Sequence, residues 1–255
     1  MAFGDAGSYA RFMGRFSEPL APAFADVLRD LEGRILDVGC GPGVLTQVLV
    51  DRYGADRVDA IDPTSGFVEA ARERLPGVDV RLGSAEALPY ADGSYGAAYA
   101  QLVVHFMNDP VRGLAEMARV VQPGGRGLVA ACVWDHGGGR GPLSPFWDAV
   151  AEVDPDEHRE RSSAGSTEGD LTRLFGEAGL VDVTEGSLRV KLALDSFEEW
   201  WAPFEESVGT VGDYLAAHPG SIGPIRDRCR ERLGEGPFEV EADAWTAMGR
   251  SSSSR

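Results

Sequence analysis

Apolar and polar positions change their period along the first half of the chain. Short, nearly continuous apolar runs occupy 34–38, 57–62, 78–82, 96–101 and 127–133. Runs of this length are typical of strands that are buried on both faces of a parallel sheet. Between them, apolar residues at helical spacing predict helices over 44–49, 65–75 and 111–121. This order of strands and helices predicts an α/β fold with a mostly parallel sheet.

The N-terminus and the second half of the chain show a less regular pattern. Residues 8–30 are predicted to be helical, with a break marked by Pro19 and Pro22. Beyond residue 134, strands are predicted over 181–194 and 238–248, and helices over 146–150, 168–178, 196–207, 211–217 and 222–233. The resulting division is an N-terminal helical cap at 1–30, a core at 31–195 and 236–250, a helical lid at 196–235 and a disordered tail at 251–255.

A glycine-rich turn at 39–43 follows the first predicted strand and leads directly into a helix. Strand, glycine turn and helix in this order form a cradle for a ligand, because Gly39 and Gly41 let it approach the main chain. We expect unpaired backbone N–H groups at the start of the helix to point at that ligand. The dinucleotide-binding fingerprint needs a glycine at position 44, where this chain has Val44.

An acidic residue, Asp62, ends the second predicted strand at about twenty residues past the turn. A carboxylate at this place can accept hydrogen bonds from both hydroxyls of an adenosine ribose. The alternative is a capping role for the next helix, for which Thr64 or Ser65 is better placed. We therefore predict that Asp62 binds a ribose.

Four stretches between residues 34 and 134 resemble the class I S-adenosylmethionine (SAM) dependent methyltransferases, of the small-molecule, UbiE-like type-11 kind. I-L-D-V-G-C-G-P-G at 35–43 resembles motif I of that family, and S-A-E-A-L-P at 84–89 is similar to its G-D-A-E-x-L-P stretch. H-F-M-N-D-P at 105–110 is similar to H-H-x-x-D-P, and P-G-G at 123–125 to the turn before strand five. The resemblance implies a Rossmann-like seven-stranded sheet in the order 3-2-1-4-5-7-6, with the last strand antiparallel and helices on both faces.

The resemblance also implies SAM as the cofactor and transfers a set of binding positions to this chain. They are Tyr9, Arg15, Asp37, Gly39, Cys40, Gly41, Asp62, Pro63, Ser84, Ala85, Glu86 and Gln101. Ser84 stands where the family has an acid that reads the adenine edge, and a hydroxyl is a weaker, uncharged acceptor. Gly96 replaces a second acid of the family. Arg15 could pair with the SAM carboxylate, or it could be a solvated surface arginine.

Two histidines follow strand ends on the cofactor side, and either could take a proton from a hydroxyl acceptor. His136 lies in a glycine-rich loop, expected to be flexible, after the fifth strand, and His105 lies in a stretch that matches the family. The alternative is that neither takes part, because methyl transfer often needs only positioning. We expect the loop at 137–141 and the insertion at 196–233 to form a lid that orders when ligands bind.

Aromatic residues are concentrated in the segments that are free to form this lid. They are Trp134, Trp147, Trp200, Trp201 and Phe204. Two interpretations stay open: these side chains form the core of the lid itself, or some of them line a pocket. A pocket of this kind would accept an apolar, planar or polyketide-like molecule.

Composition narrows the classes of partner. The chain of 255 residues has a formal net charge of −17, which disfavours nucleic acids and anionic membrane surfaces. Its three cysteines, unevenly spaced, predict a reducing cytoplasm, with no disulfide framework and no metal site. No leader peptide or membrane-spanning run is predicted, so a cytoplasmic location is expected.

These patterns predict an enzyme that transfers the methyl group of SAM to a small, apolar or aromatic metabolite. Whether oxygen, nitrogen or carbon is methylated stays open, as does the oligomeric state. The first alternative is a SAM-binding protein of the same fold that performs non-methylating chemistry or acts as a scaffold. The second is an NAD(P)-dependent oxidoreductase, which Val44 and the matches at 84–89 and 123–125 disfavour.

Overall fold

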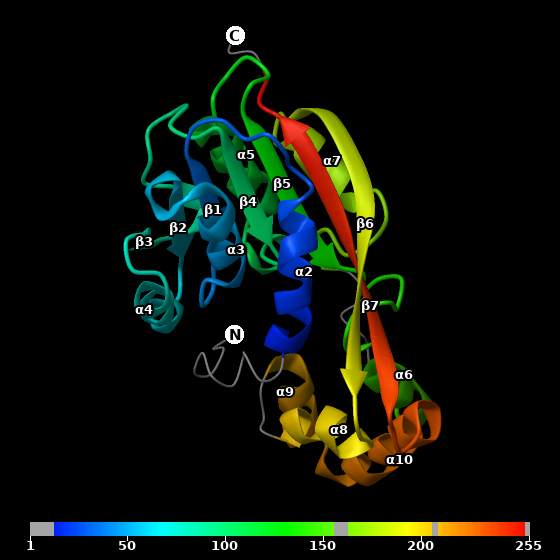
Figure 1. Ribbon diagram of the computed structural model, residues 1–255. Helices are drawn as coiled ribbons and strands as arrows, with labels where there is room; N and C mark the ends of the chain where they lie inside the picture. The colour runs from blue at the N-terminus through cyan, green and yellow to red at the C-terminus, as the bar shows by residue number, and fades with distance from the viewer. Residues whose placement is uncertain (1–12, 156–162, 206–208, 253–255) are drawn as a thin grey trace.

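One twisted sheet of seven strands forms the centre of the protein (Figure 1). The structure is a computed structural model that describes residues 13–155, 163–205 and 209–252. The strands are β1 (Ile35–Val38), β2 (Val58–Asp62), β3 (Asp79–Leu82), β4 (Ala97–Gln101), β5 (Leu128–Trp134), β6 (Val181–Leu194) and β7 (Phe238–Arg250). Their order is β3-β2-β1-β4-β5-β7-β6. The strands β1 to β5 are parallel, and β7 runs antiparallel to both β5 and β6. The predicted fold class and strand order are confirmed.

Helices cover both faces of this sheet. They are α2 (Arg15–Ala25), α3 (Val44–Tyr53), α4 (Ser65–Arg74), α5 (Pro110–Val120), α6 (Ser144–Val153), α7 (Asp170–Glu177), α8 (Phe197–Glu205), α9 (Gly209–Ala217) and α10 (Ile222–Leu233). Short 3-10 turns are η2 (Ala55–Arg57), η3 (Ala85–Ala87), η4 (Val104–Phe106) and η5 (Pro219–Ser221). Apolar side chains of α2 and α3 pack on one face of the sheet, and those of α5 and α7 pack on the other.

The antiparallel strands β6 and β7, together called the β6–β7 hairpin although α8–α10 connect them, are longer than the other strands of the sheet. The last residue of β5, Trp134, pairs with Ala244, but β6 and β7 continue their pairing to Leu194 and Phe238. The projecting end of the hairpin carries α6, α8, α9 and α10 beyond the carboxyl ends of the parallel strands (Figure 1). This extra layer stands over the edge where open α/β sheets bind ligands.

Gly96 departs from the family pattern because the chain packs tightly against it. A Cβ atom at this position would lie 1.7 Å from the carbonyl oxygen of Glu32. No side chain fits there without moving the backbone ahead of β1, so local packing accounts for the glycine in place of the acid.

The C-terminal tail is partly fixed, which corrects the expectation of disorder from residue 251 onward. Ser251 is buried, its hydroxyl donates to the carbonyl of Gln122 at 2.5 Å, and its amide donates to the carbonyl of Gly127 at 3.0 Å. Residues 253–255 lie outside the described part.

No helix within the described residues is both long and apolar enough to cross a bilayer.

Candidate active site at the carboxyl ends of the parallel strands

The glycine turn at 39–43 joins β1 to α3 and is held by its own backbone. The amides of Gly39 and Cys40 both donate to the carbonyl of Ile61, at 2.7 and 3.1 Å, and the amide of Gly43 donates to Cys40 at 3.0 Å. The amide of Gly41 donates to Asp62 Oδ2 at 2.9 Å. These turn amides are therefore engaged within the protein, whereas the expectation of unpaired N–H groups concerns the first residues of α3 and stays a prediction.

Asp62 lies at the end of β2 and ties this turn to the next helix. Its Oδ1 accepts from the amide of Thr64 at 2.8 Å, while Oδ2 accepts from Gly41. Burial raises the pKa of this carboxyl, and the two backbone hydrogen bonds oppose that shift. Each carboxylate oxygen has a further lone pair, so Asp62 can order the backbone and still accept from a ligand.

Asp37, inside β1, is almost completely buried and faces α3. The hydroxyl of Thr46 donates to its Oδ2 at 2.6 Å. Burial, together with the nearby charge of Asp62, raises the pKa of Asp37 to about 7, against the hydrogen bonds from Thr46. Two acids share this corner of the sheet, so a bound positive charge would relieve their mutual repulsion.

The space beside the turn fits a cofactor at Gly41. A Cβ added to Gly39 would collide with Val103, and one added to Gly43 would collide with Leu75. A Cβ on Gly41 would meet nothing within 4 Å, and Gly41 has the positive φ of 54° that glycine tolerates. Open space therefore adjoins the Asp62 carboxylate, where an adenosine ribose and a positively charged sulfonium would both find partners.

Ser84 and Glu86, two of the predicted cofactor positions, bond to each other. Ser84 caps η3: its Oγ accepts from the amide of Glu86 at 3.3 Å, and its hydroxyl donates to the Glu86 carboxylate. The other oxygen of Glu86 accepts from the amide of Asn108 at 2.9 Å. The carboxylate thus fixes the segment after η4, while Ala85 lies buried between these contacts.

The remaining predicted cofactor positions differ in burial and in hydrogen-bond partners. Cys40 is buried in the turn, Pro63 is exposed after β2, and Tyr9 lies outside the described residues. Gln101 Nε2 donates to the carbonyl of Ser17 at 3.2 Å, but its buried Oε1 has no hydrogen-bond partner. Arg15 bonds the lid: its guanidinium lies 2.5 Å from the carboxylate of Glu199 in α8.

His105 and His136, which follow the ends of the neighbouring strands β4 and β5, lie close together. Their ring centroids are 6.0 Å apart. Burial, together with the neighbouring ring, lowers the pKa of His105 to about 3, and its buried Nδ1 has no hydrogen-bond partner. Burial also lowers the pKa of His136, against the charge of Asp135. Both rings are therefore neutral at pH 7.

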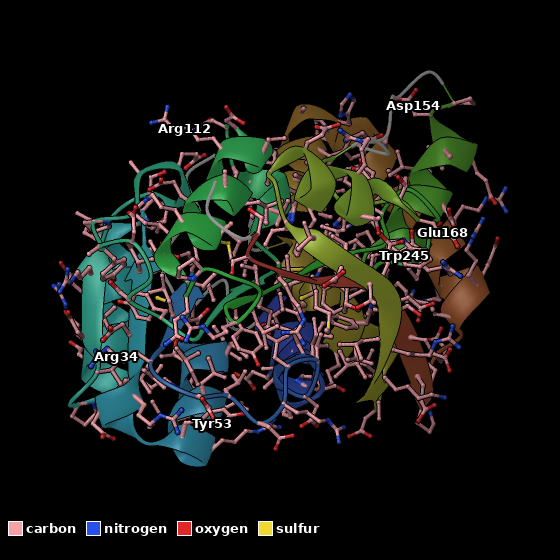
Figure 2. The ribbon with its side chains drawn as sticks, turned by 90° about the horizontal axis from the view of Figure 1, so that it is seen from above. Arg34, Tyr53, Arg112, Asp154, Glu168 and Trp245 are labelled. Atoms are coloured by element: carbon pink, nitrogen blue, oxygen red, sulfur yellow. The ribbon has the colours of Figure 1, made fainter. Side chains whose placement is uncertain are left out.

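The glycine-rich loop after β5 is closed by hydrogen bonds, contrary to the expected flexibility. Asp135 accepts from the amide of Gly138 at 2.7 Å and from Arg140 Nε at 2.6 Å. The amide of Gly137 donates to Ser166, and the Arg140 guanidinium lies over the ring of Trp245, 5.4 Å from its centroid. Figure 2 shows Trp245 on the β6–β7 side of the molecule, opposite Arg34 and Tyr53. The loop thus holds His136 in place.

The aromatic residues beyond β5 form one buried cluster at the projecting end of the hairpin. It comprises Phe146, Phe197, Trp200, Trp201 and Phe204, all fully or almost fully buried. Their rings meet in edge-to-face, tilted and stacked pairs. Most of the aromatic surface is therefore the core of this layer, the first of the two predicted interpretations. A cavity of about 20 Å³ remains between Phe16, Leu143, Trp200 and Phe204.

Two residues of the site were missed in the sequence. Thr46, which meets Asp37, could have been noticed as a polar residue on the apolar face of its helix. Trp134 was read only as an aromatic of the lid, yet its indole Nε1 is buried without a partner at the end of β5. Its strand parity, the same as that of Cys132, places it on the α2 face of the sheet.

Comparison with known proteins also points to a methyltransferase. Residues 36–129 match a family described as a methyltransferase domain. The chain is 42% identical over 132 residues to an uncharacterized methyltransferase of Mycobacterium tuberculosis, covering 51% of each chain. It is 40% identical over 91 residues to a trans-aconitate 2-methyltransferase of Rhizobium etli, covering 34% of this chain and 36% of that one.

A solved structure from Thermotoga maritima, described as a SAM-dependent methyltransferase and possible histamine N-methyltransferase, has the same fold. Its TM-score is 0.57 at 20% identity, covering 96% of this chain and 95% of that one. The curated matches span about half or less of the relatives' own length. The sheet order, motif I with Asp37, the acid Asp62 at the end of β2 and the methyltransferase domain matched over residues 36–129 all agree with the class I SAM-dependent methyltransferases.

Proposed function

We propose that this protein transfers the methyl group of SAM to a small, largely apolar molecule. The observation that carries the proposal is the pairing of Asp62 with the open face of Gly41 at the carboxyl edge of the sheet. When bound, SAM supplies an electrophilic methyl group on a positively charged sulfur. In the proposal, Asp62 accepts from the ribose hydroxyls, and the buried Asp37 adds a favourable field for the positive charge.

The rest of the chain would contribute orientation and a dry environment. The charge of the sulfonium fades as the methyl group moves, so exclusion of water favours the transition state over the ground state. The projecting layer of α6 and α8–α10 supplies apolar cover above the strand ends. In-line positioning of two bound molecules accounts for most of the rate in such a reaction.

The proposed acceptor is small because the site is covered and the surface is acidic. The buried rings of Phe146, Trp201 and Phe204 fill most of the layer over the strand ends. A net charge of −17 repels polyanions such as RNA and DNA. A small apolar metabolite meets neither obstacle.

Calorimetry of Asp62→Ala tests the cofactor part of the proposal. Loss of charge-assisted hydrogen bonds in a buried site should weaken SAM binding by roughly 1.5–3 kcal/mol, about 10- to 150-fold. Asp59→Ala is the matched control, because Asp59 is a buried acid of the same strand that pairs with Arg34 away from the turn. Unchanged affinity of Asp62→Ala for SAM, or preferential binding of NADH by the wild type, would contradict the proposal.

A turnover screen separates methyl transfer from the alternative of a SAM-binding protein with another task. The protein is incubated with SAM and a panel of small aromatic metabolites, and S-adenosylhomocysteine is measured together with the methylated product. Acceptor-dependent formation of both supports methyl transfer. Tight SAM binding without turnover across the panel would favour the non-methylating alternative.

A further inference from the structure

Buried polar atoms without partners gather where β4 and β5 end. Among the described residues, Gln101 Oε1, His105 Nδ1 and Trp134 Nε1 are each shielded from solvent and make no hydrogen bond. Leaving one such atom unpaired costs about 1–3 kcal/mol. Trp134 is 1% exposed, so water does not pair its indole N–H from the bulk solvent. A bound ligand is the partner that would remove this cost.

The sheet register places Gln101 and Trp134 side by side. Gln101 pairs with Cys132, and Trp134 is the next residue of β5 on the same face. A strand spacing of ~4.8 Å and a rise of ~3.3 Å per residue put their Cα atoms about 8 Å apart. The same turn of α2 covers both: Ser17 accepts from Gln101 Nε2, and the ring of Phe16 meets that of Trp134 at 6.5 Å.

The histidines adjoin this place from the ends of the same two strands. His136 lies two residues after Trp134, and its amide donates to the carbonyl of Trp134 at 2.8 Å. His105 lies in η4, directly after β4, with its ring 6.0 Å from that of His136. The polar atoms thus surround the strand ends next to the cofactor corner of Asp37 and Gly41.

The unpaired atoms have opposite hydrogen-bonding character. The indole N–H of Trp134 can only donate, so it needs an acceptor on the ligand, and Gln101 Oε1 can only accept, so it needs a donor. A carboxylate has no proton for Gln101, and an ammonium has no lone pair for Trp134. A neutral hydroxyl satisfies both with one oxygen atom.

Charges around the site also exclude an anionic acceptor. Asp37 lies on the strand next to β4, and two arginines of the surrounding segments are engaged: Arg15 pairs with Glu199, and Arg140 pairs with Asp135. The histidines are neutral at pH 7. A carboxylate placed here would be buried beside acids with no free positive partner, which is strongly unfavourable.

We infer that the methyl acceptor presents a neutral hydroxyl group, held between Gln101 and Trp134, with its apolar body directed under α8. This inference deepens the proposed function and rests on it. The ring of Phe16 contacts that of Trp134 and also lines, with Leu143 and Trp200 of α8, a cavity that has room for roughly one water molecule. An aromatic acceptor therefore requires α8 to shift outward as it enters.

The hydroxyl chemistry balances without a further reagent. The hydroxyl oxygen forms the new C–O bond, and the electron pair of the broken C–S bond stays on sulfur, which becomes neutral. As the bond forms, the hydroxyl proton leaves its hydrogen bond with Gln101 Oε1 and passes to the neutral imidazole of His136. His105 is the weaker base, because burial lowers its pKa to about 3.

The test uses acceptors that differ only in the polar group: 2-naphthol, 2-naphthoate and 2-naphthylmethylamine, with phenol, benzoate and benzylamine as a smaller set. Binding to the complex with S-adenosylhomocysteine is measured by calorimetry, and methylation is measured with SAM. We expect the hydroxyl members to bind at least tenfold more tightly than their carboxylate and ammonium counterparts. Equal or better binding of a carboxylate or an ammonium, or binding by no hydroxyl member, overturns the inference.

Trp134→Phe tests the donor directly, because it removes the N–H and keeps an aromatic ring. We expect it to weaken 2-naphthol binding at least fivefold and to leave SAM affinity unchanged. Trp245→Phe is the matched control, since Trp245 Nε1 is also buried and unpaired but belongs to the α7 face of the sheet. Equal effects of the two variants on naphthol binding would overturn the role of Trp134. Loss of SAM binding by the wild type would instead contradict the proposed function itself.

Discussion

Asp37 is an acid in a place where water would normally be needed to solvate it. Asp37 is 1% exposed, and its carboxylate accepts a hydrogen bond from the hydroxyl of Thr46 instead of pairing with a cation. Burial raises its pKa from 3.8 to about 7, so the folded protein binds this proton more tightly than the unfolded chain does. Stability from this group is complete below the unfolded pKa and is lost as the pH rises through the folded pKa.

Replacement of Asp37 by Asn should therefore stabilise the ligand-free protein at alkaline pH. The gain is near zero at about pH 4 and grows to at most about 4 kcal/mol above pH 7, with the Thr46 hydrogen bond retained. Unfolding in urea at several pH values measures it. The same variant should bind SAM more weakly, and a variant that is no more stable at pH 8 than the wild type would contradict the raised pKa.

The two histidines differ as candidate bases, although both lie in the site. His105, with a pKa lowered to about 3, is a weak base, whereas His136 is less strongly shifted and is held by its loop. For a hydroxyl acceptor we predict that His136→Ala lowers kcat by roughly 100-fold at saturating SAM. Since burial lowers the pKa of His136, the wild-type rate should be constant at alkaline pH and should fall in acid buffer, at a lower pH than that at which a free imidazole titrates.

His105→Ala serves as the comparison in the same assay. A smaller loss with this variant, and loss of the acid limb with His136→Ala, would assign the proton to His136. Full rate and an unchanged pH profile after the His136 substitution would show that positioning alone suffices.

Motif positions could be predicted at the residue scale, whereas hydrogen-bond partners could not. The sequence placed Asp37 inside the first strand, just before the turn, and Asp62 at the end of the adjacent strand, and the structure has both there. It could not show that Gly39 and Cys40 donate to Ile61, since this depends on how closely β1 and β2 approach. The same holds for Ser84, whose hydroxyl bonds Glu86 two residues away.

At the scale of elements, α2 connects the cofactor side to the lid through one ion pair. Arg15 at the start of α2 contacts Glu199 of α8 at 2.5 Å, and both side chains are partly exposed. The family resemblance offered the SAM carboxylate or solvent as the partner of Arg15. The sequence could not reveal Glu199, because α8 lies far away along the chain. Exposed pairs of this type contribute roughly 0.2–1 kcal/mol.

We predict that Arg15→Ala changes the lid more than the cofactor site. Hydrogen exchange in α8 should quicken, while SAM affinity should change by less than about twofold. Arg52→Ala is the control, because Arg52 pairs with Asp26 at the opposite end of α2. A tenfold loss of SAM affinity in Arg15→Ala, absent from Arg52→Ala, would return Arg15 to the SAM carboxylate.

Hydrogen exchange should also separate the loop after β5 from the lid helices. The amides of Gly137, Gly138, Gly139 and Arg140 are all hydrogen-bonded, so they should exchange slowly even without ligand. The backbone amides of α8–α10 should exchange more slowly when S-adenosylhomocysteine and an acceptor bind. Arg140→Ala should speed exchange in the loop, and equal protection of α8–α10 with and without ligands would leave those helices a purely structural layer.

At the scale of the whole molecule, the fold was predictable where the apolar period was clear. Strand and helix bounds agree to within a few residues, but the strand order came from the family resemblance, not from periodicity. The extension of β6 and β7 beyond β5 was not predictable. A strand's length does not reveal how many of its residues find a partner on each side.

The final prediction concerns the charge of the whole chain and its choice of substrate. A net charge of −17 creates a repulsive potential toward polyanions. This repulsion reaches farthest at low salt, because the Debye length is about 30 Å at roughly 0.01 M salt. We therefore expect no methylation of RNA or DNA at low or physiological salt, and turnover on small apolar hydroxyl compounds instead. Labelled SAM with total RNA, genomic DNA and naphthol in parallel, at two salt concentrations, measures this. Useful turnover on either nucleic acid at physiological salt would show that a local basic surface outweighs the net charge.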